Sequence, residues 1–465
     1  MSVHRILYSL IIITSAYIIS TFSSGCAQIG APTGGPRDTL PPILVKATPE
    51  QKTLNFKGNK ISLNFDEYIN VVDLQSNLLI SPVQKSNPVV SYILKNVTLK
   101  FKDSLLPNTT YSINFGDAIK DNNEGNVLKN FTYLFSTGSA IDSLSFSGKI
   151  FLAETGKTDS TIIAMLYRNA DDSAVIKRKP NYIAKVNSDG SFIFQNLPAD
   201  KFKVYGLKDG DGGKTYNSKT EIFAFADSGI TVSKNTAPVT LYASALEKET
   251  PKTTVATSKK PVVEKKLRYT SNLEQKNQSL LLPLRLSFNN SLKVFDPEKI
   301  ILADTNYIPL TNAKISLDST AKIISVNIPW QPELNYVLLL PKEAVQDSAG
   351  NTIFKTDTLK FITKKTEDYG RVILRFKNLD ISKHPILQFV EGDIIKYSYP
   401  LTGTEWNNKL FTPGQYEIRI LYDSNQNGIW DPGNYSKKLQ PEKAVTLAEK
   451  ISIRADWDNE RDIQL

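Results

Sequence analysis

Short runs in which apolar and polar residues alternate recur along most of the chain. Ile61, Leu63 and Phe65 are spaced two apart, and the same spacing follows at 97–101 and 111–115. Alternation with a period of two places one set of side chains on each face of an extended strand. The pattern therefore predicts half-buried β-strands that pack face to face.

The same series of runs returns in the second half of the chain. The runs at 284–288, 324–328 and 336–340 match those of the first half in order and spacing. In each copy an Asp-rich turn region follows, at Asp121–Asn126 and at Asp347–Asn351, before a closing strand. Internal repetition of this kind indicates tandem copies of one folding unit.

Composition supports the same fold class. The 465 residues include 20 Tyr and 21 Phe but only 2 Met, and 23 Gly and 24 Pro are spread between the alternating runs. Aromatic and β-branched residues favour strands, and Gly and Pro favour the turns between them. The sequence therefore predicts an all-β chain built of tandem β-sandwich modules.

Residues 41–138 resemble the SbsA-type bacterial Ig-like domain. The segment opens with Pro41-Pro42, passes through the Asp-rich turn and closes with Phe135-Ser136-Thr137. Residues 267–364 resemble it more loosely, because the second copy lacks the Pro-Pro pair. The resemblance implies two Ig-like sandwiches that serve as structural or interaction units.

Two further segments alternate with the Ig-like copies. In residues 144–245 a turn at Asp189-Gly190 precedes two alternating Phe residues and a Leu197-Pro198 corner, which resembles a transthyretin-like or carboxypeptidase-regulatory-like sandwich. Residues 368–465 repeat the corner at Pro413-Gly414 without the Asp-Gly turn. The resemblance implies a β-sandwich for each segment.

The N-terminus resembles the leader of a bacterial lipoprotein. A short basic region and an apolar stretch at 6–19 precede Ser23-Ser24-Gly25 and then Cys26, the only cysteine. The apolar stretch is shorter than the roughly 20 residues of a membrane-spanning helix, which is typical of a signal sequence. We predict a signal peptide at 1–25, with lipidation of Cys26. A flexible tether rich in Gly and Pro follows at 26–40.

The resemblance to envelope lipoproteins of Bacteroidota implies anchoring in the outer membrane. A cluster of acidic residues after the cysteine often marks export to the exterior in that phylum, and none follows Cys26. This favours the periplasmic side.

Residues 246–266 form a predicted linker between the two halves. They are rich in Lys, Glu, Thr and Pro and contain few apolar side chains. Little burial is available to such a segment, so the sequence predicts that it is mobile or extended.

Motifs for catalysis and for nucleic-acid binding are absent from the sequence. His384 is the only histidine after the leader, and no nucleophile elbow, paired-histidine zinc motif or phosphate loop occurs. The formal net charge is +9, but 56 basic residues are interleaved with 47 acidic ones and form no basic stripe. We therefore expect a non-enzymatic protein that does not bind nucleic acid.

One Asp- and Asn-rich loop has the spacing of a calcium-binding loop. Oxygen-bearing side chains stand at positions one, three, five and nine, with Gly428 at position six. The predicted ligands are the side chains of Asp423, Asn425, Asn427 and Asp431 and the backbone carbonyl of Ile429. Asn434 replaces the usual bidentate Glu at position twelve, so binding is expected to be weak. The alternative is a hairpin turn, for which Asp, Asn and Gly are equally suited. The corresponding loop at Asp209–Asn217 has Lys214 in place of the Gly.

Three tryptophans fall in the last module, namely Trp406, Trp430 and Trp457. Exposed indole rings stack on sugars, whereas buried ones fill a sandwich core.

Two functions follow from these observations. The favoured one is a lipid-anchored, non-enzymatic envelope protein that acts as a spacer, scaffold or interaction module. The alternative is a glycan-binding envelope protein that uses the aromatic residues of the last module.

Overall fold

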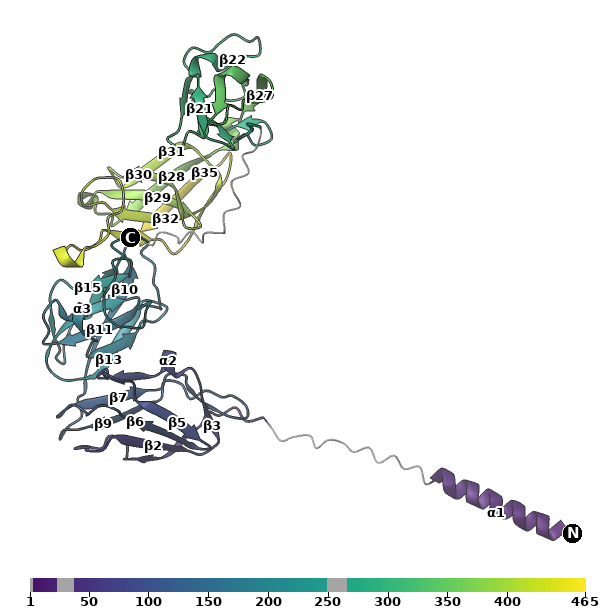
Figure 1. Ribbon diagram of the computed structural model, residues 1–465, viewed down its shortest axis with the longest axis vertical. Coiled ribbons are helices and arrows are strands. Elements are labelled where there is room, and N and C mark those ends of the chain that lie inside the picture. Colours follow the sequence, from purple (N-terminus) through teal and green to yellow (C-terminus); the bar gives the residue numbers. More distant parts are fainter. Residues whose placement is uncertain (1–2, 23–36, 249–265) are drawn as a thin grey trace. The chain divides into compact units, whose positions relative to one another are not determined.

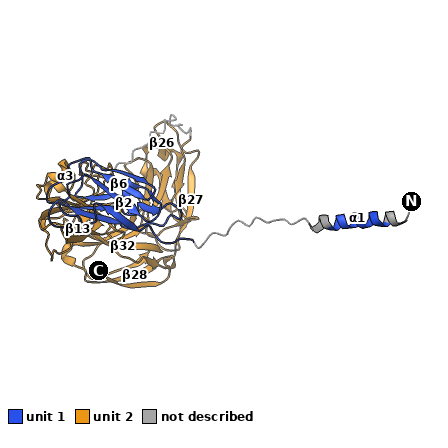
Figure 2. Cartoon of the chain, turned by 90° about the horizontal axis from the view of Figure 1, so that it is seen from below, with its two compact units in different colours: residues 1–141 blue, residues 142–465 orange. Residues whose placement is uncertain are grey.

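The computed structural model of the chain describes residues 3–22, 37–248 and 266–465 (Figure 1). Apart from helix α1 (Val3–Phe22) and a few single turns, the described chain is built of β-strands arranged in several separate sheets, as the alternation predicts. It divides into two compact units, residues 1–141 and residues 142–465 (Figure 2). Among the described residues, no helix has the length and hydropathy needed to span a membrane. The predicted lipidation site Cys26 lies outside the described residues.

The first unit contains one β-sandwich. Its larger sheet has the order β1 (Leu44–Thr48), β2 (Lys60–Phe65), β6 (Asn96–Lys100), β5 (Val89–Ile93). A second sheet has the order β4 (Leu79–Ser81), β7 (Thr110–Asn114), β9 (Thr132–Ser136), and β3 (Ile69–Val71) pairs with β8 (Ile119–Asp121). A single helical turn, α2 (Leu74–Asn77), connects β3 with β4.

The alternating residues of this sandwich form its core. Ile61 and Leu63 on β2 stand opposite Leu99 and Val97 on β6, and all four are buried. They pack with the aromatic rings of the second sheet in one continuous cluster. The period-two pattern therefore identifies the inward face correctly.

The third sandwich, in the second unit, repeats this plan. One sheet has the order β18 (Tyr269–Ser271), β20 (Leu284–Phe288), β24 (Ile323–Asn327), β23 (Lys314–Leu317). The other has the order β19 (Asn277–Gln278), β27 (Asp357–Thr363), β25 (Asn335–Leu340), β22 (Ile301–Ala303), and β21 (Leu292–Phe295) pairs with β26 (Val345–Asp347). Short 3-10 turns lie at η1 (Pro297–Lys299) and η2 (Lys342–Ala344). Leu284 and Leu286 pair with Val326 and Ile324, as their counterparts do in the first sandwich.

The second sandwich has a different topology. Its smaller sheet has the order β13 (Ser191–Leu197), β10 (Leu144–Leu152), β17 (Val239–Ala243). Its larger sheet has the order β12 (Tyr182–Lys185), β11 (Ile163–Arg168), β14 (Lys201–Leu207), β15 (Phe223–Phe225), with β16 (Ile230–Thr231) also on β14. The turn α3 (Ala174–Lys177) follows β11. In the smaller sheet β10 pairs in parallel with β17, the last strand of the module.

The fourth sandwich repeats that second topology strand for strand. Its smaller sheet has the order β31 (Glu405–Phe411), β28 (Gly370–Lys377), β35 (Asp458–Gln464), and β28 pairs in parallel with β35. Its larger sheet has the order β30 (Ile394–Pro400), β29 (Pro385–Glu391), β32 (Gly414–Tyr422), β33 (Lys443–Thr446), with β34 (Ile451–Ile453) also on β32. Short 3-10 turns lie at η3 (Thr366–Asp368), η4 (Ile381–Lys383) and η5 (Tyr435–Lys437).

The second and fourth sandwiches pack against each other, although the linker and the third sandwich separate them in sequence. The segment between β32 and β33 places Tyr435 in an aromatic cluster of the second sandwich with Tyr205, Phe223 and Phe225. Backbone contact is also direct, because the N–H of Ala444 donates to the carbonyl of Ala153 at 2.8 Å. The linker therefore does not mark a boundary between compact units, because the second sandwich belongs to the same compact unit as the third and fourth.

Candidate functional site

Two acidic loops occupy equivalent places in the second and fourth sandwiches. One connects β14 with β15, and the other connects β32 with β33. In each, the first Asp accepts a hydrogen bond from the backbone N–H five residues later: Asp209 from Lys214 at 3.2 Å, and Asp423 from Gly428 at 2.8 Å. Lys214 and Gly428 both adopt positive φ, which Gly tolerates and Lys does not favour. The structure thus supports the correspondence of the two loops that the sequence predicts.

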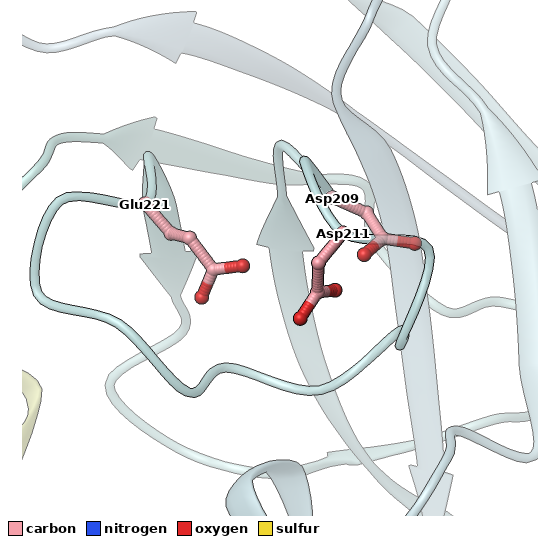
Figure 3. A group of neighbouring side chains, drawn as sticks. All are labelled: Asp209, Asp211 and Glu221. Carbon is pink, nitrogen blue, oxygen red and sulfur yellow. The ribbon is translucent and has the colours of Figure 1, made fainter.

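The loop of the second sandwich gathers three carboxylates (Figure 3). Oxygens of Asp209, Asp211 and Glu221 lie within 4.8 Å of one another, and within the described ranges no other trio of acidic, His or Cys side chains is grouped so closely. Donors from the loop hold two of them, because Asp211 accepts from the Asn217 amide at 2.7 Å and Glu221 accepts from the Asn217 N–H at 3.0 Å. The Asn217 amide and the Gly213 N–H lower the pKa of Asp211. Oxygen ligands of this kind suit a hard divalent cation.

The spacing of the loop residues does not identify Glu221 as a candidate ligand, because it stands twelve residues after Asp209, just before β15. Its acidic side chain in an exposed loop looks ordinary in sequence. Only the return of the chain toward β15 brings it to the two aspartates.

The loop of the fourth sandwich is closed by internal hydrogen bonds. The amides of Asn425 and Asn427 donate to Asp431 Oδ2 at 2.6 and 2.7 Å. Their Oδ1 atoms accept from the backbone N–H groups of Asn427 and Ile429 at 3.1 and 2.9 Å. The side chains predicted as calcium ligands are thus brought together, and the same contacts would also stabilise a plain turn.

Glu442 supplies a carboxylate that the sequence analysis of this loop missed. It is 8% exposed, and it accepts from the N–H of Ser424 at 2.6 Å and from the N–H of Asp431 at 3.1 Å. Burial raises the pKa of Glu442, and the negative charges of Asp423 and Asp431 raise it further. Asn434, at position twelve, instead caps η5 by accepting from the Lys437 N–H. If the loop binds calcium, Glu442 is better placed than Asn434 to complete the set of calcium ligands.

The Asp residues that open the equivalent turns of the first and third sandwiches are structural. Asp121 is buried and its two carboxylate oxygens accept hydrogen bonds from four backbone N–H groups, those of residues 123–126. Burial alone would raise its pKa, but these four donors hold the pKa of Asp121 below its ordinary value. Asp347 accepts from the Ala349 and Asn351 N–H groups in the same way.

The three tryptophans of the fourth sandwich have different surroundings. Trp406 is half-buried and packs on Tyr399 and Phe389 with ring centroids 4.9 and 5.3 Å apart. Trp457 is 60% exposed beside the Arg454 guanidinium. Trp430 is half-buried, and its Nε1 donates to the Glu442 carbonyl at 2.8 Å. Trp406 lies on β31, Trp457 lies before β35, and Trp430 lies in the β32–β33 loop.

His384 ends the turn η4, where it adopts positive φ. Its Nε2 lies 3.2 Å from the amide nitrogen of Gln426 in the loop of the fourth sandwich. This contact ties the loop to the start of β29 and is a structural role for the one histidine that follows the predicted leader.

Comparison with known proteins identifies the first sandwich. Residues 38–137 match the bacterial Ig-like domain family. The Ig-like part of the resemblance is therefore confirmed for this module. No curated protein shows significant sequence similarity to the chain.

Several solved structures show weak likeness. The N-terminal part of the bacterial S-layer protein SbsC is 13% identical, with 44% of this chain and 44% of that chain covered and a TM-score of 0.17. The major pilin subunit BcpA of Bacillus cereus is 8% identical, with 69% and 99% covered and a TM-score of 0.17. The TIE protein of Bacillus anthracis is 10% identical, with 93% and 75% covered and a TM-score of 0.16. This chain thus spans less than half of the SbsC fragment, and no property of these proteins carries over at such scores.

Proposed function

We propose that the chain is a lipid-anchored, non-enzymatic protein of the cell envelope that acts as a spacer or scaffold. The observation that carries the proposal is the position of the only cysteine, Cys26, directly behind an apolar N-terminal segment and before the first sandwich. Lipidation there would attach the membrane to one end of a chain of β-sandwiches. Outer-membrane anchoring, with the periplasmic side favoured, is part of the same proposal.

The architecture supports a mechanical role. Each sandwich has its own buried hydrophobic core, so each keeps its shape without a disulfide. The contact between the second and fourth sandwiches adds a buried aromatic cluster that holds two modules in one fixed arrangement. The match of residues 38–137 to the bacterial Ig-like family supports a bacterial protein of this modular kind.

Fractionation of cells that express the full chain tests the anchor. We expect the wild type in the membrane fraction and the detergent phase, and we expect Cys26→Ser to be soluble or to retain residues 1–25. Ser24→Ala, which keeps the cysteine, is the matched control. If Cys26→Ser matches the wild type in both size and partitioning, the anchor proposal fails.

Glycan binding is the second candidate function, and one observation favours it. Of the three tryptophans, Trp430 is the one that lines a pocket together with a buried arginine. An aromatic platform beside polar and charged groups is a common arrangement for sugar recognition.

A further inference from the structure

A pocket of about 470 Å³ lies where the fourth sandwich meets the end of the second. Its floor is the outer face of the β30–β29–β32 sheet, and its walls come from the residues that follow β17 and from the loop after β32. Strand pairing places Ser398, Gln388 and Arg419 side by side across that floor. The polar residues of three adjacent strands therefore share one site.

Arg419 is the unusual member of this set. It is 4% exposed, and its Nε has no hydrogen-bond partner anywhere in the described part of the chain. Its Nη2 lies 3.4 Å from Glu417 Oε1, a long contact, while Glu417 Oε2 lies 2.9 Å from the ammonium of Lys157. The Glu417 carboxylate is thus the shared counter-ion of Arg419 and Lys157. A buried guanidinium whose nearby carboxylate is shared with a second cation is costly, and an anion bound in the pocket would reduce that cost.

The remaining walls suit a sugar ring. Trp430 is fixed by the hydrogen bond from its Nε1 to the Glu442 carbonyl, so its indole is a rigid wall of the pocket. Leu421 and Ile395 add apolar surface, whereas Ser398 and the amide of Gln388 offer donors and acceptors for hydroxyl groups. At the rim, Lys248 pairs with Glu154 at 2.8 Å, and both side chains are partly solvated. The uncompensated charge therefore lies at Arg419 on the floor.

We propose that this pocket binds a saccharide that bears a carboxylate, such as a hexuronate unit of an envelope polymer. The carboxylate pairs with the guanidinium of Arg419 on the pocket floor, a charge-assisted contact of the strong class. The apolar face of the ring packs on Trp430, and hydroxyl groups bond to Gln388 and Ser398. This inference rests on the glycan-binding candidate and adds the chemical class of the sugar to it; it does not depend on the lipid anchor.

A matched ligand pair tests the inference on the full mature chain. Methyl glucuronide and methyl glucoside differ at C6, where one carries a carboxylate and the other a hydroxymethyl group, and sodium acetate supplies the carboxylate alone. Titration calorimetry, with tryptophan fluorescence as a second readout, should give roughly tenfold or tighter binding of the glucuronide than of the glucoside. Acetate should bind more weakly than the glucuronide, because it makes no contact with Trp430.

Two variants and one control complete the test. Arg419→Gln should remove the preference for the glucuronide and leave binding of the glucoside unchanged, while Trp430→Ala should weaken both. Arg375→Gln alters a solvated arginine on β28 and should change neither. Circular dichroism and a melting curve show whether Arg419→Gln folds, and the ligand comparison on the wild type decides the inference even if it does not.

Each result separates the two claims. If the glucuronide and the glucoside bind equally well, glycan binding stands and the carboxylate inference is overturned. If neither sugar binds, both fall. If acetate binds as tightly as the glucuronide, the site is an anion site without sugar recognition, which also overturns the inference.

Discussion

The hydroxyl oxygens of Tyr205 and Tyr435 lie 2.9 Å apart in a buried contact, although 230 positions separate the two residues in sequence. Tyr435 donates its own proton to the carbonyl of Asp172 at 2.7 Å, so Tyr205 is the donor to Tyr435. Burial raises the pKa of Tyr205 to about 12 and also raises the pKa of Tyr435. Both phenols therefore stay protonated at neutral pH and keep this bond, which holds the fourth sandwich on the second.

This contact predicts how the chain responds to cleavage in the linker. A protease site inserted between residues 249 and 265 should yield two fragments that co-elute in size-exclusion chromatography, because the second and fourth sandwiches stay associated. Tyr435→Ala removes a buried ring, a loss of about 3–5 kcal/mol for large-to-small aromatic changes, and should let the fragments separate. Tyr92→Ala, an exposed residue of the first sandwich, is the control. Separation of the wild-type fragments would contradict the packing described here.

Asp121 predicts an acid-sensitive first sandwich. Its folded pKa lies below the ordinary value of about 3.9, so its stabilisation is present above about pH 4 and is lost as pH falls through the folded pKa. Asp121→Asn leaves backbone donors without acceptors, which should cost about 1–3 kcal/mol at pH 7. Calorimetry of the full chain should show one transition lowered by several degrees. The exposed Asp117→Asn should leave it unchanged, and an unmoved transition in Asp121→Asn would show that the turn does not depend on the carboxylate.

Calcium binding by the loop of the fourth sandwich stays a prediction. The structure determines which substitution in the loop tests it best. Calcium at ten times its dissociation constant should stabilise the fourth sandwich by about 1.4 kcal/mol, seen as a higher melting temperature. Asp423 is buried and accepts hydrogen bonds from Asn427 and Gly428, so Asp423→Ala would weaken the fold even in chelator.

Asp431→Asn is the cleaner variant, since it keeps the side-chain size and should abolish the calcium shift. The exposed Asp393→Asn serves as the control. If calcium at about 10 mM, on the order of the weakest extracellular sites, leaves the wild-type melt unchanged, the loop is a turn only.

Much of the fold follows from the sequence, because the strands depend on a local period of two. Ile61 and Leu99, for example, face each other as their alternation implies. The site depends on contacts that no local pattern encodes. Arg419 alternates with Tyr416, Ile418 and Ile420 and so belongs to the outward face of β32, which the pattern assigns to solvent. Residues that follow β17 in the second sandwich and the loop after β32 border that face, and Arg419 is only 4% exposed there.

Glu442 and Tyr435 show the same limit in another form. A twelve-residue loop that begins at Asp423 ends at Asn434, so Glu442 lies outside it in sequence. Glu442 contacts Asp431 only because β33 starts beside that residue. Tyr435 lies in a polar segment with no periodicity, and its burial depends on a partner module more than 200 residues away. The contacts between a loop of one sandwich and the surface of another form only when the chain has folded, and no local sequence pattern predicts them.

The mass of the N-terminal peptide of the mature protein, purified from membranes, tests the proposed anchor most directly. We predict that the mature chain begins at Cys26 and that this peptide carries the added mass of a diacylglyceryl group on sulfur. A mature chain that retains residues 1–25, or that carries Cys26 as an unmodified thiol, would contradict the proposal.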